Sequence, residues 1–208
     1  MSFETGDVRK AVRRLSTVDP ILGNVIRRVG PFTLKAEIGG YEILVRSILS
    51  QQISTAAART IRTRLQELLP AKKIQPKSID GLTDDQLQSA GISQQKRGYL
   101  RDLTRCTLDG TINFRRITAR SDEDAIAELI QVKGVGRWTA QMYLLFSLGR
   151  PDVFAVDDLG IQNAMKALYS LTAKPKRAEL EAIAEIWAPH RSIASWYLWR
   201  AIDQKVIS

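Results

Sequence analysis

Two adjacent aspartates, Asp157 and Asp158, stand where an apolar loop gives way to a predicted helix. An aspartate in that place is most often a plain N-cap, because its side chain accepts a backbone N–H of the first turn. Two neighbours cannot both be the cap, and the positive end of the helix dipole favours the ionised form of the second. A fixed, ionised carboxylate stabilises positive charge that develops on a substrate. On the residues alone the plain cap stays the favoured interpretation of Asp158, and a catalytic role is the alternative.

A short turn with two glycines precedes Asp158, and its second glycine, Gly136, lies 22 residues before the aspartate. Gly134 and Gly136 join two predicted helices, and small residues let a phosphate approach the backbone N–H groups at the start of the second helix. Lys133 and Arg137 add positive charge on either side. Such a turn binds a phosphodiester without reading base sequence. Glycines also serve tight helix–helix turns for dihedral reasons alone, so the turn gains weight only together with Asp158.

Helix-start signals recur along the rest of the chain. A serine or threonine precedes several stretches of helical apolar periodicity, in two cases with a partner residue three positions later. These starts are Ser54, Thr83 with Gln86, Ser93, and Ser121 with Asp124. A further helix is expected over about 137–148. Only 32–34 and 112–114 alternate as strands do, and both are short enough to be loops. We expect an all-α protein.

Composition limits the class of protein. The chain has 208 residues and a net charge of +9, which suits one globular unit with a polyanionic partner such as nucleic acid. A single cysteine and a single histidine exclude an intramolecular disulfide and a four-cysteine iron–sulfur or zinc site. No apolar run reaches the roughly 18–20 residues of a membrane span, and no secretory signal is seen. We expect a cytoplasmic, nucleoid-associated protein, or a nuclear one in a eukaryote.

Several stretches, matched in order, resemble the helix-hairpin-helix DNA glycosylase superfamily and, within it, the 3-methyladenine DNA glycosylase II (AlkA-type) branch. They are Asp19-Pro20-Ile21-Leu22 with Gly30-Pro31, Ile48-Leu49-Ser50-Gln51-Gln52-Ile53-Ser54, Gly91-Ile92-Ser93-Gln94-Gln95-Lys96 with Tyr99-Leu100, Gly136-Arg137-Trp138-Thr139-Ala140, Val156-Asp157-Asp158, and Arg191-Ser192 leading to Trp199. The resemblance covers roughly residues 15–203. The superfamily signature is the hairpin followed, at this distance, by an aspartate.

The resemblance implies a two-lobed helix-hairpin-helix glycosylase fold with the active-site cleft between the lobes. The whole chain, 1–208, would form one glycosylase unit. One lobe would be a helical barrel over about 40–149, with the hairpin at 129–140. The other would combine about 1–39 with 150–208. The resemblance gives no reason to expect more than a monomer.

The implied activity is hydrolysis of the N-glycosidic bond of alkylated purines, 3-methyladenine and 7-methylguanine, in double-stranded DNA. The enzyme would flip the damaged nucleotide out of the helix, and Asp158 would stabilise the oxocarbenium-like state. Trp138 and Trp199 would hold the cationic base, with Tyr143 as a weaker candidate because some relatives carry their tyrosine one position earlier, at Met142. Lysine at the position of Trp138 would give strand cleavage through a Schiff base, so tryptophan implies a monofunctional enzyme.

The resemblance also assigns DNA contacts. The gap left by the flipped base would be filled from Gln51-Gln52-Ile53, with Gln52 expected first and Ile53 second. Ser54, which follows them, would also contact DNA. The hairpin would grip the backbone through Lys133, Gly134, Gly136, Arg137 and Thr139. No cofactor and no transition metal are implied, although backbone carbonyls near Val132 and Val135 could hold a monovalent cation.

Two alternatives stay open. One is a glycosylase for other lesions, such as deaminated or oxidised bases, which differs only in its pocket. The other is a non-catalytic DNA-binding module that reuses the hairpin. That module would explain the charge and the glycines but would leave Asp158, Trp138 and Trp199 without a role.

Overall fold

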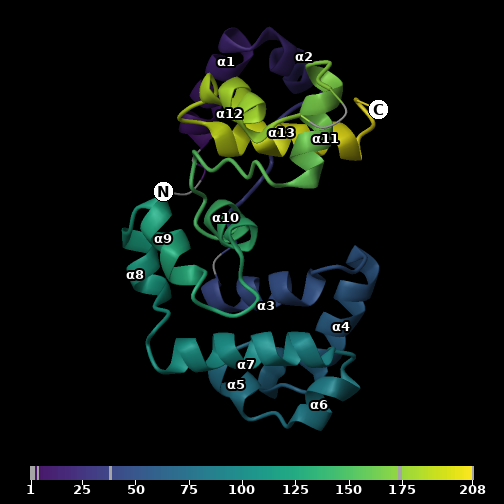
Figure 1. Ribbon diagram of the computed structural model, residues 1–208, viewed down its shortest axis with the longest axis vertical. Helices are drawn as coiled ribbons and strands as arrows, with labels where there is room; N and C mark the ends of the chain where they lie inside the picture. The colour runs from purple at the N-terminus through teal and green to yellow at the C-terminus, as the bar shows by residue number, and fades with distance from the viewer. Residues whose placement is uncertain (1–2, 4, 38, 173–174, 208) are drawn as a thin grey trace. The chain divides into compact units, whose positions relative to one another are not determined.

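The chain folds into helices, as the sequence predicted, and no strand occurs in the residues that the computed structural model describes: 3, 5–37, 39–172 and 175–207 (Figure 1). The chain divides into two compact units. Unit 1 comprises Met1–Ala36 and Leu144–Ser208, and unit 2 comprises Glu37–Tyr143. The sequence had placed the change of lobe near residues 40 and 149, and a cleft between lobes stays a prediction. Within the described ranges, no helix is long and apolar enough to cross a bilayer.

Unit 1 is built from two N-terminal helices and three that follow unit 2 in the chain. These are α1 (Thr5–Val18), α2 (Pro20–Val29), α11 (Leu159–Leu168), α12 (Arg177–Glu185) and α13 (Arg191–Asp203). Helix α13 packs against α1, α2 and α11, and it is buried along most of its length. Trp187 and Trp196 lie in this core, 0% and 7% exposed, as expected of aromatic residues at helical spacing. Buried Asp19 caps α2 and accepts the Trp187 indole N–H at 2.8 Å.

Unit 2 contains the remaining helices. These are α3 (Gly40–Ser50), α4 (Thr55–Glu67), the 3-10 turn η1 (Pro70–Lys72), α5 (Pro76–Asp80), α6 (Asp84–Ser89), α7 (Gln94–Leu108), α8 (Phe114–Ala119) and α9 (Asp122–Leu129). Helix α7 is the central one, since α3, α5 and α6 all pack against it. Helix α10 (Arg137–Phe146) follows the hairpin and carries the boundary between the units, at Tyr143 and Leu144. It ends two residues earlier than the sequence suggested.

The predicted helix starts are confirmed by their caps. The Ser54 hydroxyl accepts the Ala57 N–H at 3.2 Å, and Ser93 caps α7 through Lys96 N at 3.4 Å. Thr83 and Gln86 form a full capping box at the start of α6. Ser121 caps α9 through Asp124 N at 3.2 Å. Each cap satisfies backbone N–H groups that a helix start leaves without an intrahelical acceptor, which fixes where the element begins.

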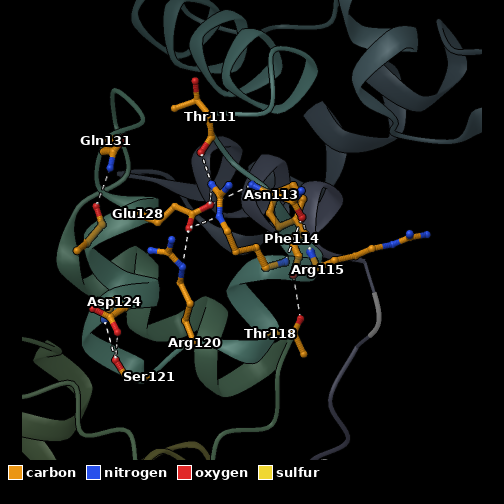
Figure 2. Close-up of polar contacts among 12 residues, drawn as sticks. Thr111, Asn113, Phe114, Arg115, Thr118, Arg120, Ser121, Asp124, Glu128 and Gln131 are labelled. Carbon is orange, nitrogen blue, oxygen red and sulfur yellow. Dashed lines mark hydrogen bonds and ion pairs between the residues drawn. The ribbon is translucent and has the colours of Figure 1, made fainter.

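A buried carboxylate holds α8 to α9 just before the hairpin (Figure 2). Glu128 is 3% exposed and accepts the Asn113 N–H at 3.1 Å, the Arg116 Nη2 at 2.7 Å and, in an ion pair, the Arg120 Nε at 3.4 Å. Burial alone would raise the pKa of Glu128, but these donors lower it by more, so its net pKa lies below its ordinary value. The carboxylate therefore stabilises the segment that leads into the hairpin.

Replacing Glu128 with glutamine tests this role. We expect the free energy of unfolding at pH 7 to fall by about 1–2 kcal/mol, a figure reduced because both arginines are more than a third exposed. A carboxylate whose folded pKa is depressed stabilises above its unfolded pKa, near the ordinary 4.5, and loses that effect as pH falls through the folded value. Urea unfolding from pH 7 down to about pH 3 should therefore show the two proteins converging.

The matched control is Glu123→Gln. Glu123 pairs with Arg137 at 2.5 Å, but its side chain is 71% exposed. An exposed pair contributes little, so this variant should stay within about 0.5 kcal/mol of wild type at pH 7. Equal losses in the two variants would contradict a special role for the buried carboxylate.

Candidate active site

Asp158 is both the cap of α11 and the acceptor of a tryptophan N–H. Its Oδ1 accepts the Ile161 backbone N–H at 2.9 Å and the Trp199 indole N–H at 2.9 Å. The side chain is half-buried at the positive end of the α11 dipole, which favours a carboxylate. The ordinary N-cap interpretation is thus correct as far as it goes. A second donor from another helix adds the fixed orientation that a catalytic carboxylate needs.

An aromatic pair lies beside this carboxylate in unit 1. Trp199 is half-buried and stacks on Phe146, with ring centroids 5.7 Å apart and an interplanar angle of 25°. Gly160 makes room for the indole: a Cβ there would lie 3.1 Å from Trp199 Cδ1 and 3.0 Å from Asp158 Oδ1. Neither Phe146 nor Gly160 was among the residues expected from the sequence. A glycine two residues after the candidate aspartate was the one signal that could have been used.

The loop that carries Asp158 is held by the start of α13. Ser192 donates its hydroxyl to Arg150 O at 2.6 Å and accepts the Val153 N–H at 2.9 Å. Arg191 binds both oxygens of Asp152, at 2.8 and 2.7 Å. Helix α13 therefore positions the carboxylate in two ways. Residues at its start hold the loop that precedes Asp158, and Trp199 near its end donates an N–H to the Asp158 side chain.

Asp157, the neighbour of Asp158, has a different environment. It is exposed and forms hydrogen bonds through both oxygens to Arg177 Nη1 at 3.2 Å. Arg177 lies on α12 and also pairs with Glu181 at 2.8 Å. The two adjacent aspartates therefore have different surroundings. Asp157 lies in a surface ion network, and Asp158 lies beside the aromatic pair.

The two hairpin glycines serve different purposes in unit 2. Gly134 has φ +83°, and a Cβ there would lie 2.2 Å from the Tyr99 ring, so only glycine fits. Gly136 has open space around the position of a Cβ, and its carbonyl accepts the Ala140 N–H at 3.0 Å as the first bond of α10. Among the residues that the structure describes, none would be met by a Cβ at 136. The open space is compatible with the predicted approach of a phosphate to the backbone there.

The charged residues of the hairpin are at the surface. Lys133 is exposed, and its backbone N–H is donated to Asp102 Oδ2 at 2.8 Å. Arg137 is exposed but ion-paired with Glu123, so it must exchange this partner to contact a phosphate. Thr139 is 4% exposed, which leaves its backbone N–H in the first turn of α10, and not its hydroxyl, as the group that could contribute. Their contacts with DNA stay predictions.

The turn between α3 and α4 carries the residues expected to fill the gap in DNA. Gln51 ends α3 and donates its side-chain N–H to Gly134 O at 2.8 Å, so the turn and the hairpin lie together in unit 2. Gln52 is exposed with φ +56°, a conformation that side chains rarely adopt. Ile53 is 38% exposed. Backbone strain at an exposed tip is typical of a residue held out for a partner.

The remaining predicted residues lie in unit 2. Trp138 is 39% exposed, a position from which an indole can meet a ligand. Tyr143 is 2% exposed and packs on Phe114, with centroids 5.9 Å apart, so its burial weighs against contact with a substrate. The Val132 carbonyl accepts the Val135 N–H at 3.0 Å, and a cation at these carbonyls stays a prediction.

Comparison with known proteins identifies the family. The model of the HhH-GPD superfamily of base excision DNA repair proteins matches residues 45–189, which include the hairpin and Asp158. The chain belongs to this superfamily. The alkylbase DNA glycosidase-like protein mag2 of Schizosaccharomyces pombe is 32% identical over 203 residues, which cover 93% of each chain.

Two solved HhH-GPD relatives share the fold at similar identity. The 3-methyladenine DNA glycosylase of Schizosaccharomyces pombe, solved in complex with abasic DNA, has a TM-score of 0.86 and 32% identity, covering 93% of this chain and 97% of its own. A DNA-3-methyladenine glycosidase from Bacillus halodurans has a TM-score of 0.85 and 31% identity, covering 94% and 90%. The resemblance to the 3-methyladenine glycosylase branch of the HhH-GPD proteins is therefore confirmed.

Proposed function

We propose that the chain is a monofunctional DNA glycosylase that removes 3-methyladenine and 7-methylguanine from double-stranded DNA in base excision repair. The observation that carries the proposal is the fixed carboxylate: Asp158 Oδ1 receives one N–H from the helix start and one from Trp199, beside a stacked aromatic pair. The names of the relatives at 31–32% identity support the same substrate class. The enzyme would act wherever the genome lies, in the nucleoid or the nucleus.

The reaction needs only water and a positioned carboxylate. The bond between the base nitrogen and C1′ of the sugar breaks, its electron pair stays with the base, and the sugar becomes oxocarbenium-like. Ionised Asp158 stabilises that charge. Water then forms the new bond to C1′ and passes its proton to solvent or to the carboxylate. An alkylated purine is already cationic and leaves as a neutral base, so a general acid is not needed.

Aromatic side chains suit a cationic leaving base. The electron-rich face of an indole attracts a cation by about 0.5–2 kcal/mol when the two are well placed. Trp199 is fixed on one side by Phe146, and Trp138 presents an exposed indole. Because Trp138 carries no amine, it cannot form the Schiff base of a strand-cleaving glycosylase. We therefore propose that the product is an abasic site in an intact strand.

Release of base from methylated duplex DNA tests the proposal. The protein should release 3-methyladenine and 7-methylguanine, detected by chromatography of the soluble bases, and the strands should stay uncleaved until alkali is added. Release of deaminated or oxidised bases alone would favour the alternative substrate class. Binding to DNA without release of any base would favour the non-catalytic module.

Trp199→Phe separates the two roles of this tryptophan. Phenylalanine keeps a ring against Phe146 but removes the N–H donated to Asp158. A hydrogen bond to a charged group is worth about 1.5–3 kcal/mol, so we expect kcat to fall roughly tenfold or more while KM changes little. Single-turnover rates of base release measure the effect.

The control is Trp196→Phe on the same helix. Trp196 is 7% exposed and packs on Phe32 and Tyr197, with no part in the proposed chemistry. It should lower stability and leave kcat close to wild type. If Trp199→Phe also leaves kcat unchanged, the indole N–H does not orient the carboxylate.

A further inference from the structure

One face of α7 contacts the backbone of both DNA-binding turns in unit 2. Lys96, Tyr99 and Asp102 are spaced by three residues, so they lie along one side of the helix. Each of them meets main chain: Lys96 at the end of α3, Tyr99 and Asp102 at the hairpin. The proposed function has no chemical role for any of them.

Lys96 caps the C-terminus of α3, the helix that leads into the gap-filling turn. Its ammonium donates to Leu49 O at 2.7 Å and to Gln51 O at 2.8 Å. A cation at a helix C-terminus satisfies carbonyls that have no intrahelical donor and interacts favourably with the dipole. Lys96 is partly buried to do this, and the burial lowers its pKa. The next residue after Gln51 is the strained, exposed Gln52.

Tyr99 and Asp102 hold the hairpin. The Tyr99 ring fills the space where a Cβ of Gly134 would lie, 2.2 Å from it. Asp102 accepts the Lys133 N–H at 2.8 Å and is itself held by Arg105 at 2.9 Å. Burial would raise the pKa of Asp102, but these donors lower it by more, so the carboxylate form is favoured.

A direct bond joins the two turns. The Gln51 side-chain amide donates to Gly134 O at 2.8 Å. The Gln51 carbonyl also accepts from Lys96, and Gly134 packs against the Tyr99 ring. Lys96, Gln51, Gly134 and Tyr99 therefore form a continuous chain of contacts from the gap-filling turn to the phosphate-binding turn. All of its members contact backbone or one another and leave the tip, Gln52, exposed.

We propose that Lys96 is a positioning residue that, with Gln51, holds the tip of the α3–α4 turn in register with the hairpin. The hairpin grips the phosphate backbone, and the link delivers the Gln52 side chain to the space that the flipped base leaves. The inference rests on the proposed function. It predicts that Lys96 supports base flipping by placing the turn. This effect is distinct from a general contribution of its charge to DNA affinity or of its contacts to fold stability.

The test is Lys96→Met, with Lys77→Met as the matched loss of charge from an exposed site on α5. Each full-length protein is bound to a duplex with 2-aminopurine beside a 7-methylguanine or beside a stable abasic analogue, and fluorescence reports unstacking. We expect Lys96→Met to lose most of the fluorescence rise and to release base about tenfold or more slowly. Its affinity for undamaged duplex should match that of Lys77→Met.

Gln51→Leu is the second variant, which keeps Lys96 and removes only the bond to Gly134. It should show the same loss of fluorescence and of release rate, even if Lys96→Met folds poorly. Wild-type fluorescence and release in Gln51→Leu, or a loss in Lys96→Met that tracks only its melting temperature, would overturn the inference. The abasic duplex keeps this test apart from the proposed function: a wild-type protein that unstacks it but releases no base refutes the activity and not the link.

Discussion

Asp158→Asn should release alkylated bases at least about 10²-fold more slowly than wild type. Asparagine is as good an N-cap as aspartate, so the start of α11 should be kept. In the proposed mechanism, the variant loses the negative charge that stabilises the developing oxocarbenium ion. Rates are measured by single-turnover release of 7-methylguanine from methylated duplex, and binding to an abasic duplex checks that the variant still recognises DNA.

Asp157→Asn is the matched control for that experiment. It removes a charge from the adjacent residue, which lies in the exposed network with Arg177. Its rate should stay within about threefold of wild type, because an exposed charge is screened by solvent. If the two asparagine variants behave alike, Asp158 is only a helix cap and the catalytic assignment fails.

Gly134→Ala should lower the stability of the fold, whereas Gly136→Ala should lower the affinity for DNA. A methyl group at 134 meets the Tyr99 ring and forces a side chain into positive φ, so we expect a loss of about 3 kcal/mol in the free energy of unfolding. A methyl group at 136 would have no described atom within 4 Å, so stability should change by less than about 0.5 kcal/mol. It would, however, stand where a phosphate approaches, and affinity for duplex DNA should fall about tenfold.

Urea unfolding and fluorescence anisotropy with a short duplex measure the two effects. Raising the salt concentration weakens phosphate contacts, so the difference in affinity should be recorded at one fixed ionic strength. Equal DNA affinity for wild type and Gly136→Ala would mean that the backbone there is not approached by phosphate. A fully stable Gly134→Ala would mean that Tyr99 can move aside.

The helix starts could be predicted because caps are local. A serine or threonine meets an N–H only three residues away, so the pattern at Ser54, Thr83 and Ser93 determines the structure there. The same holds for Asp158, whose place at the start of α11 follows from its neighbours. These predictions needed no knowledge of how distant segments pack.

The contacts that complete the site could not be predicted, because they join segments far apart in the sequence. Lys96 meets main-chain carbonyls at Leu49 and Gln51, and a carbonyl has no side-chain signature. Phe146 was inside a predicted helix, but nothing in the sequence indicates that its face meets Trp199. Tyr143 was a candidate for the pocket, but it lies on a buried face of α10 and packs against Phe114 instead.

Unit 1 can be completed only after the whole chain has been synthesised, because it combines the two ends of the sequence. Helices α1 and α2 emerge first, yet they pack against α13, which follows about 170 residues later and also supplies Trp199 and the residues that hold the Asp158 loop. The hairpin and the turn between α3 and α4 belong to unit 2, the continuous stretch made in between. A ribosome that stops before α13 therefore yields a polypeptide that contains Asp158 but lacks both the Trp199 N–H and the Ser192 side chain that holds the preceding loop. We expect such a truncated product to release no alkylated base.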